Sequence, residues 1–179
     1  MPKNILVISS SPRKNGNSNA LAYSFARGAE NAGNNVEKIT LYDKHISFCK
    51  GCMACQKTRN CVINDDAGEI VDKMLEADVI VFATPIYYYS ISGQLKTMLD
   101  RSNPLYTADY RFRDVYLLAS AAEDEENTVN GAVTAVQGWI DCFQKASLKG
   151  VVFAGGVTDI GEIAGHPALE KAYDMGKNV

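Results

Sequence analysis

Polar side chains follow the first apolar segment of the chain and form a pattern typical of an anion-binding loop. The apolar residues 5–8 lead into residues 9–19, a stretch rich in Ser and Asn with one glycine and the basic residues Arg13 and Lys14. A buried strand that ends in such a loop and then starts a helix brings free backbone N–H groups and the positive end of the helix dipole to one place. The sequence therefore predicts a ligand that carries a phosphate.

Four of the five cysteines lie close together, as Cys49, Cys52, Cys55 and Cys61. Their C-x2-C-x2-C-x5-C spacing favours a [4Fe–4S] cluster, because three thiolates this close can wrap a cubane. Zinc also takes four thiolates, although its sites more often use two separated C-x2-C pairs. Free thiols or redox-active pairs are the third alternative, and all three stay open. Cys142 lies apart from these four and is expected to be a partly buried structural thiol.

The composition is that of an ordinary globular protein. The chain has 179 residues, of which 46% are hydrophobic and 22% charged, and its net charge is −3. This charge argues against a nucleic-acid-binding protein, whose binding face should be strongly basic. There is no apolar run of about 18 residues that could span a membrane and no secretory signal sequence, so a cytoplasmic protein is expected. Cysteines in such a protein more often serve metal binding or redox chemistry than disulfides.

Apolar periodicity predicts an alternation of strands and helices. The predicted strands cover residues 4–9, 35–41, 78–84, 114–120 and 150–154, and the predicted helices cover residues 18–32, 66–76, 92–102, 127–146 and 167–176. A Cys-rich segment, residues 42–64, separates the second strand from the second helix and is called the Cys loop below. Five alternating units predict a single α/β domain, with a parallel sheet and helices on both of its faces.

Two strand orders are compatible with this alternation. A dinucleotide-binding Rossmann domain normally shows G-x-G-x-x-G after its first strand, and that motif is absent. The order 2-1-3-4-5, with a ligand at the switch point between strands 1 and 3, fits better. The strand at 35–41 alternates between polar and apolar residues, so it is expected at an edge of the sheet.

A proline and three consecutive tyrosines follow the third predicted strand. The segment starts at Thr84 and continues through Pro85 and Ile86 to the tyrosines at 87–89. In a parallel sheet this segment lies at the same edge as the phosphate-type loop, so its apolar and aromatic area could cover a flat ring. Tyrosine is also enriched in subunit interfaces, and the two roles are compatible.

Two stretches of the chain resemble the flavin loops of a known family. Residues 11–18 (SPRKNGNS) are similar to the phosphate loop of the NAD(P)H-dependent FMN reductases, in the flavodoxin-like superfamily, and residues 84–96 (TPIYYYSISGQLK) with Asp100-Arg101 are similar to that family's second flavin loop. Lys96, Asp100 and Arg101 equally fit a solvated helix face with a weak ion pair. The resemblance extends over essentially the whole chain and implies a flavodoxin-like three-layer fold with bound FMN.

The resemblance also implies which residues form the FMN site. The loop after the first strand would hold the phosphate, residues 85–88 would lie along the isoalloxazine, and the loop at 120–123 would make a third contact. The cofactor-binding residues implied in this way are Ser9, Ser11, Arg13, Asn17, Ser18, Asn19, Thr84, Pro85, Ile86, Tyr87, Tyr88, Ser120, Ala121 and Ala122.

Within this family, the iron–sulfur flavoproteins carry a Cys quartet after the second strand, and the spacing of the four loop cysteines agrees with theirs. The family resemblance implies NAD(P)H as hydride donor and a small electron acceptor, such as a quinone, a free flavin or a metal. The alternative is a relay that takes single electrons from a ferredoxin-like donor through a [4Fe–4S] cluster to FMN, and a third reading is a binding domain without flavin. No catalytic side chain is expected, because the redox chemistry belongs to the cofactor. The resemblance further implies a homodimer or a tetramer.

Overall fold

The computed structural model describes all residues 1–179. Strands and helices alternate along the chain, as the sequence predicts. The elements are β1 (Asn4–Ser9), α1 (Asn17–Asn31), β2 (Asn35–Thr40), η1 (Leu41–Asp43), α2 (Cys55–Thr58), α3 (Ala67–Glu76), β3 (Val79–Tyr87), β4 (Ser90–Ile91), α4 (Gly93–Arg101), η2 (Asn103–Thr107), β5 (Asp114–Ser120), η3 (Glu126–Val129), α5 (Asn130–Ile140), β6 (Ser147–Ala154) and α6 (Pro167–Lys177). No helix among them is long and apolar enough to cross a lipid bilayer.

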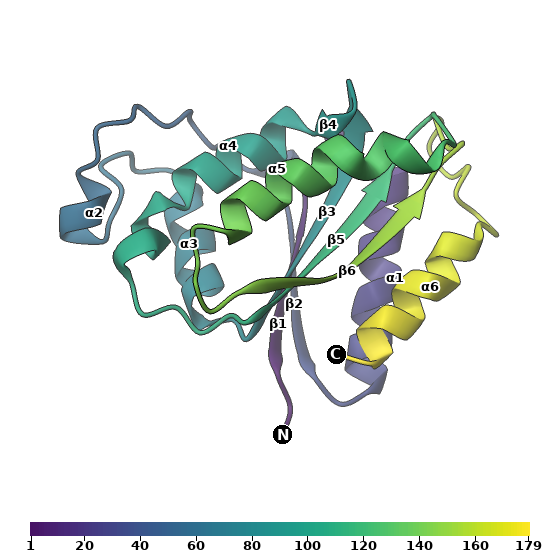
Figure 1. The fold of residues 1–179 in the computed structure, drawn as a ribbon, viewed down its shortest axis with the longest axis horizontal. Helices are drawn as coiled ribbons and strands as arrows, with labels where there is room; N and C mark the ends of the chain where they lie inside the picture. The colour runs from purple at the N-terminus through teal and green to yellow at the C-terminus, as the bar shows by residue number, and fades with distance from the viewer.

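The main sheet is parallel and has the strand order β2-β1-β3-β5-β6 (Figure 1). This is the predicted order 2-1-3-4-5, because β5 and β6 are the fourth and fifth predicted strands. The alternating strand β2 lies at an edge, as its pattern indicates. The short strand β4, which the sequence analysis missed, pairs antiparallel with the end of β3.

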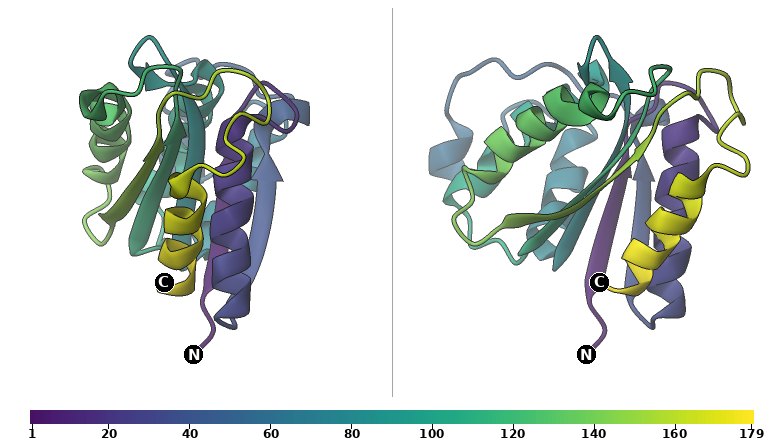
Figure 2. Two further views of the ribbon diagram at one scale, coloured as in Figure 1. Left: turned by 90° about the vertical axis from the view of Figure 1, so that its right-hand side faces the viewer. Right: turned by 45° about the vertical axis from the view of Figure 1, so that its right-hand side comes forward.

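Each face of the sheet has its own apolar core, and helices cover both faces (Figure 2). Along β1 the side chains alternate, so that Leu6 and Ile8 face the layer of α3, α4 and α5, whereas Ile5 and Val7 face α1 and α6. Phe25 of α1 is completely buried in the second core. Burial of such a side chain stabilises the fold by roughly 1.5–3 kcal/mol.

Helices α1 and α6 touch along their backbones. A Cβ atom on Gly28 would overlap with the carbonyl oxygen of Tyr173, and a Cβ atom on Gly176 would overlap with the carbonyl oxygen of Phe25. Both helices therefore need glycine at the point where they meet. This contact fixes α6 against the C-terminal half of α1.

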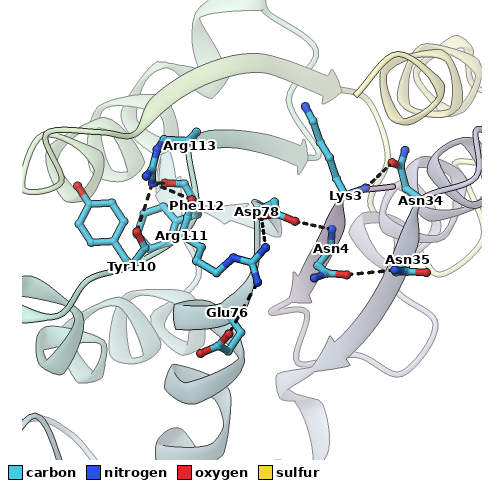
Figure 3. A network of polar contacts seen from close by, with 10 residues as sticks. All are labelled: Lys3, Asn4, Asn34, Asn35, Glu76, Asp78, Tyr110, Arg111, Phe112 and Arg113. Carbon is cyan, nitrogen blue, oxygen red and sulfur yellow. Dashed lines mark hydrogen bonds and ion pairs between the residues drawn. The ribbon is translucent and has the colours of Figure 1, made fainter. Parts of the chain in front are cut away.

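A polar network closes the amino-terminal edge of the sheet (Figure 3). The Asp78 carboxylate accepts hydrogen bonds from the Asn4 backbone N–H and from Arg111 Nη2, both at 2.9 Å. The Lys3 backbone N–H donates to Asn34 Oδ1 at 3.0 Å. These groups satisfy one another and fix where β1 and β3 begin, so the network is structural. The carboxyl ends of the strands, where open α/β sheets bind ligands, lie at the opposite edge.

The helix predicted over residues 127–146 is shorter in the structure. It runs as α5 from Asn130 to Ile140 and follows the turn η3. After Ile140 the chain tightens, and the Phe143 N–H donates to the Ile140 carbonyl at 2.7 Å. Phe143 is buried in the core beyond this turn, whereas Cys142 is exposed. The expectation that Cys142 is partly buried is therefore wrong.

Candidate functional site

The end of β3 and the loops that follow β1, β5 and β6 meet in a cleft at the carboxyl edge of the sheet. The predicted site residues that line this cleft are Ser11, Arg13, Asn17, Ser18, Pro85, Ile86, Tyr87, Ser120, Ala121 and Ala122. The cleft encloses about 140 Å³, which is below the roughly 300 Å³ at which pockets for whole drug-sized ligands begin. A phosphate-sized group fits inside it, and a larger ligand would lie partly outside.

The loop after β1 closes on itself before α1 begins. The Ser11 hydroxyl accepts a hydrogen bond from the Arg13 N–H at 3.1 Å, and the Gly16 N–H donates to the Arg13 carbonyl at 3.1 Å. A Cβ atom on Gly16 would overlap with Ser11 Oγ, so this position requires glycine. The backbone of the loop thereby comes close to the cleft.

The N-terminus of α1 leaves donors without partners beside the cleft. Its N-cap is Gly16, which makes no side-chain capping bond to the N–H groups of the first turn. The Ser18 hydroxyl is buried and has no hydrogen-bond partner, and Ser18 lines the cleft. A buried unpaired hydroxyl costs about 1–3 kcal/mol. These donors together suit an anion such as a phosphate, which a helix N-terminus favours.

The loop after β6 forms the wall opposite the start of α1. Arg13 Nη1 donates to the Thr158 carbonyl at 2.7 Å, and Asn17 Nδ2 donates to the Asp159 carbonyl at 3.0 Å. Glu162 Oε2 accepts the backbone N–H groups of Thr158 and Asp159 at 2.5 and 2.8 Å. The hydrogen bonds from the Asp159 and Thr158 N–H groups hold the pKa of Glu162 below its ordinary value. Glu162 thus orders the backbone to which Arg13 and Asn17 are bound.

The cleft is also lined by four residues that were not predicted from the sequence, namely Gly16, Val157, Thr158 and Ile160. A signal for the last three was present in the two glycines that follow β6. A Cβ atom on Gly155 would lie 2.7 Å from the Asp124 Cα, and Gly156 has a φ of 69°. Two glycines at the end of a strand indicate a turn with close backbone approach, and here that turn brings the last loop against the loop after β5.

Three predicted site residues, Ser9, Asn19 and Thr84, do not line the cleft and support its walls instead. Ser9 Oγ donates to Asn19 Oδ1 behind the loop after β1. Thr84 Oγ1 accepts the Ser92 backbone N–H at 3.0 Å, and Ser92 Oγ donates to Ser10 Oγ at 2.9 Å. These buried hydrogen bonds join the loop after β1, the last part of β3 and the start of α4.

Tyr88 and Tyr89 form the tip of a tight hairpin at the rim of the cleft. Strand β3 continues to Tyr87, which pairs with Ser90 across the two-residue turn. Tyr88 has a φ of 49° and Tyr89 a φ of 60°, the left-handed conformation that Asn and Gly prefer in such turns. Tyr88 is completely exposed and does not line the cleft. Of the three tyrosines, only Tyr87 borders the cleft.

The structure does not bring the four cysteines of the Cys loop together. Cys49 and Cys52 are exposed, Cys61 is partly exposed, and Cys55 is buried, with its sulfur accepting a hydrogen bond from Asn103 Nδ2 at 3.1 Å. No three His, Cys, Asp or Glu side chains of the protein gather closely enough to hold a metal ion. Four thiolates are suitable donors for a cluster or for zinc, but from these positions they would have to move toward one another to bind either.

The alternative that Lys96, Asp100 and Arg101 form a solvated helix face is confirmed for Lys96 and Asp100. For Arg101 it is wrong. Lys96 and Asp100 form an exposed ion pair at 2.6 Å. The Arg101 side chain is buried and binds both carboxylate oxygens of Asp65, at 2.7 and 2.9 Å. Burial favours the neutral acid, but the hydrogen bond from Arg101 and those from two backbone N–H groups outweigh it and lower the pKa of Asp65 to about 2. The hydrogen bond to Asp65 in turn raises the pKa of Arg101.

Other hollows larger than the cleft lie elsewhere on the protein, and two of them are extended grooves. One, of about 570 Å³, runs between β2 and α3, and its charged residues are mostly acidic: Glu37, Glu69, Asp72 and Glu76. The other, of about 530 Å³, is mainly apolar and lies between the Cys loop, α4 and α5. Neither of these two grooves combines a helix N-terminus with an unpartnered buried donor. The cleft does, and it also lies at the carboxyl ends of the strands, where open α/β sheets bind ligands, so it is the candidate site.

A sequence model of the NADPH-dependent FMN reductases matches residues 3–126. The matched segment contains the loops after β1, β3 and β5, and so most of the cleft. The chain belongs to the NADPH-dependent FMN reductase family. At the level of the family, this confirms the resemblance seen in the two loops and the predicted class, an oxidoreductase of the FMN reductase type.

Several relatives with similar sequences are named iron-sulfur flavoproteins, and two of them illustrate the similarity. That of Methanocaldococcus jannaschii is 41% identical over 101 residues, which is 56% of this chain and 52% of the relative. That of Methanosarcina thermophila is 28% identical over 169 residues, 94% of this chain and 85% of the relative. The chain spans about half the length of several curated relatives that it matches.

A solved structure, the NAD(P)H:quinone oxidoreductase from Methanothermobacter marburgensis, matches this reductase-family chain with a TM-score of 0.77. The match covers 99% of this chain and 96% of that protein, at 17% sequence identity. Such a likeness shows the fold, and it confirms the predicted flavodoxin-like α/β architecture.

Proposed function

We propose that this chain binds FMN in the cleft and passes electrons from NAD(P)H through it to a small acceptor such as a quinone. The observation that carries the proposal is the buried Ser18 hydroxyl, which has no partner at the N-terminus of α1. Membership of the FMN reductase family supports the same ligand. The quinone oxidoreductase with the same fold supports a quinone-like acceptor.

In this proposal different residues of the cleft bind different parts of FMN. Ser11, Ser18 and the first-turn N–H groups of α1 would bind the phosphate, and Arg13 would add positive charge at the rim. Ile86 and Tyr87 would cover the ring, because they are the apolar and aromatic residues beside the phosphate position. The loop after β5 would border the ligand on the other side. When bound, FMN supplies hydride and single-electron chemistry.

The task left to the protein is positioning. No carboxylate, histidine or cysteine lines the cleft, so no side chain there is suited to general acid–base catalysis near neutral pH. The enclosed part is small, and a ring that lies across its open rim would be accessible to a second flat molecule. Holding two rings in contact is a form of catalysis by proximity.

Titration of the flavin-free protein with FMN, followed by flavin fluorescence, tests this proposal. Ser18→Ala and Arg13→Ala should each weaken FMN binding about tenfold or more, because a hydrogen bond to a charged group contributes about 1.5–3 kcal/mol. Lys14→Ala is the matched control, since Lys14 belongs to the same loop but does not line the cleft. Unchanged affinity in both test variants would contradict the phosphate position.

Two further outcomes bear on the reaction itself. A wild-type protein that binds no FMN would overturn the proposed function. Stopped-flow mixing of the FMN-loaded protein with NADH and with NADPH should bleach the flavin absorbance within seconds for at least one donor. If neither reduces the flavin, the nicotinamide donor is wrong even though the cofactor is right.

A second candidate function is an electron relay from a ferredoxin-like donor, with a [4Fe–4S] cluster on the Cys loop. The names of the two relatives and the four free thiols in C-x2-C-x2-C-x5-C spacing support it. Anaerobic purification should then give about four irons and four acid-labile sulfides per chain. A flavin-loaded protein with four reactive loop thiols and neither iron nor sulfide would reject the relay and leave the reductase.

We also propose that the protein works in the cytoplasm as a homodimer or a tetramer. The exposed Tyr88 and Tyr89 beside the cleft are of the residue type that subunit interfaces favour. Light scattering during gel filtration of the FMN-loaded protein measures the assembly directly. A monomer at micromolar concentration would overturn this part of the proposal.

A further inference from the structure

One buried guanidinium holds both ends of the segment that carries the four thiols. Arg101, the last residue of α4, donates from Nη1 to the Ser47 carbonyl at 2.8 Å and from Nη2 to the Ile63 carbonyl at 3.2 Å. Ser47 lies just before Cys49, and Ile63 lies just after Cys61. Arg101 therefore binds the chain where it enters and where it leaves the cysteine-bearing segment.

Asp65 completes this closure from the other side. Its carboxylate accepts the backbone N–H groups of Ser47 at 2.8 Å and of Ala67 at 3.1 Å, in addition to the two hydrogen bonds from Arg101. Both backbone groups of Ser47 are thus bound by the ion pair. The Arg101 and Asp65 side chains are 0% and 3% exposed, so water does not compete for these hydrogen bonds.

The helix that ends at Arg101 begins beside β4, at the carboxyl edge of the sheet (Figure 1). Its N-cap, Ser92, donates from Oγ to Ser10 Oγ and from its backbone N–H to Thr84 Oγ1. Ser10 belongs to the loop after β1 and Thr84 to the last part of β3, and both of these segments border the cleft. Helix α4 is therefore one rigid element with the cleft at its N-terminal end and the Cys loop at its C-terminal end.

The residues that follow α4 hold the Cys loop as well. Asn103 Nδ2 donates to the Cys55 sulfur at 3.1 Å, and Thr107 Oγ1 donates to the Gln56 carbonyl at 3.3 Å. In contrast, Cys49 and Cys52 are exposed, and Gly51 and Met53 between and beside them adopt positive φ angles. The loop is thus bound at its base and on the α2 side, and its exposed tip carries the first two thiols.

Stability alone does not account for an ion pair at this position. Apolar side chains of similar volume often replace a buried ion pair without loss of stability, because desolvation offsets much of the attraction. Apolar side chains could not bind the N–H and carbonyl groups of Ser47 or the carbonyl of Ile63. The Arg101–Asp65 pair instead fixes the positions of the two ends of the cysteine-bearing segment.

We propose that Arg101 and Asp65 are positioning residues of the Cys loop: they fix the ends of its thiol-bearing segment to the C-terminal end of α4, at a set place relative to the cleft at the other end of that helix. This inference rests on the proposed function only for the identity of the cleft's ligand.

Alkylation rates of the individual cysteines, measured by mass spectrometry on the whole chain with and without added FMN, test the proposal. Arg101→Lys keeps the charge but loses the planar fork that binds Asp65, Ser47 and Ile63 together. We expect Cys55 and Cys61 to react about tenfold faster in this variant, because the base of the loop opens locally. The affinity for FMN should stay within about twofold of wild type, since the cleft is built at the other end of α4.

Two control variants separate positioning from general loss of stability. Val152→Ala removes volume from the core on the opposite face of the sheet, so it should lower the melting temperature and leave the Cys55 rate unchanged. Lys96→Met breaks the exposed ion pair on α4 and should change neither. The proposal is overturned if Cys55 and Cys61 in Arg101→Lys react at the wild-type rate, or if Val152→Ala accelerates them to the same extent.

Hydrogen exchange in the wild-type protein gives an independent test should Arg101→Lys not fold. The Ser47 and Ala67 amides should be protected like those of β1, whereas the Gly51 amide at the tip should exchange rapidly. Rapid exchange of Ser47 would overturn the proposal. Failure of the protein to bind FMN would instead overturn the proposed function and leave the exchange and alkylation results as they are.

Discussion

The carbonyl oxygen of Tyr89 occupies the space that a Cβ atom would take on Gly131. This close approach packs the start of α5 against the tip of the β3–β4 hairpin and so holds Tyr87 at the cleft. We expect Gly131→Ala to push the hairpin away from the helix and to lower the free energy of unfolding by about 1–3 kcal/mol, as overpacking of a tight contact does. Urea denaturation measures the change.

Gly138 on the same helix provides the matched control. It is exposed, and no atom lies within 4 Å of the position of its Cβ. Gly138→Ala should therefore raise the free energy of unfolding by about 0.5–1 kcal/mol through helix propensity alone. Equal effects at the two glycines would show that the contact with Tyr89 is not tight.

The turn at Tyr88 and Tyr89 should be a source of strain. Both residues have φ angles near those of a type I′ turn, which Asn-Gly adopts readily and bulky residues do not. The double substitution Tyr88→Asn with Tyr89→Gly should raise the free energy of unfolding by about 1–3 kcal/mol, since each strained residue costs about that order. Thermal unfolding checks this, and a lower melting temperature would mean that the tyrosine rings contribute more packing than the backbone strain removes.

The Asp65 carboxylate should make the fold sensitive to acid. Its pKa is lowered from 3.8 to about 2, so its contribution to stability is present above about pH 4 and is lost as the pH falls toward about 2. For this almost completely buried side chain the shift corresponds to about 2 kcal/mol. In Asp65→Asn this part of the pH dependence should be missing from urea denaturation curves collected between about pH 4 and about pH 2.

The exposed partner of Lys96 is a useful control for this titration. Asp100→Asn removes a surface ion pair, which typically contributes less than about 1 kcal/mol. The variant should retain the acid sensitivity of the wild-type protein. If Asp65→Asn and the wild type lose stability in parallel over the same pH range, other carboxylates dominate acid unfolding.

Glu162 should affect ligand affinity although its side chain does not line the cleft. Its carboxylate orders the Thr158 and Asp159 backbone, to which Arg13 and Asn17 are bound. Glu162→Ala should therefore weaken FMN binding severalfold, and Glu170→Ala, an exposed carboxylate on α6, should not. Because the pKa of Glu162 is lowered by these N–H groups, the hydrogen bonds persist into mild acid and are lost as the pH falls through that lowered pKa. Equal FMN affinities for the two variants and the wild type would show that the last loop does not depend on Glu162.

The sequence predicts the elements of the sheet and most of the cleft because the signals for both are local. Continuous apolar strands and the donors that follow them, such as Ser11 and Ser18, are adjacent in the chain, and topology alone brings their loops together. The side chain of Arg101 could not be placed in this way. Its burial depends on Asp65 and on the Cys loop, which folds over the end of α4 and has no periodicity to read.

The other features that the sequence does not predict have the same physical origin. The contact between Arg13 and Thr158 joins residues 145 positions apart, and no pattern near either residue indicates it. Ser9, Asn19 and Thr84 carry the right polar atoms, but buried neighbours take up their hydrogen bonds, so they support the cleft without lining it. Polar residue type predicts that a group needs a partner; the fold determines which partner it receives.

The long-range tie between Arg13 and the loop after β6 also bears on how the protein is made. During translation the loop after β1 leaves the ribosome early, whereas Thr158 and Asp159 emerge only after the other strands of the sheet. Until then Arg13 and Asn17 lack the backbone that holds them at the cleft. On the proposed function, we expect nascent chains to remain empty of flavin, so that cells would load the cofactor into finished polypeptide rather than during its synthesis.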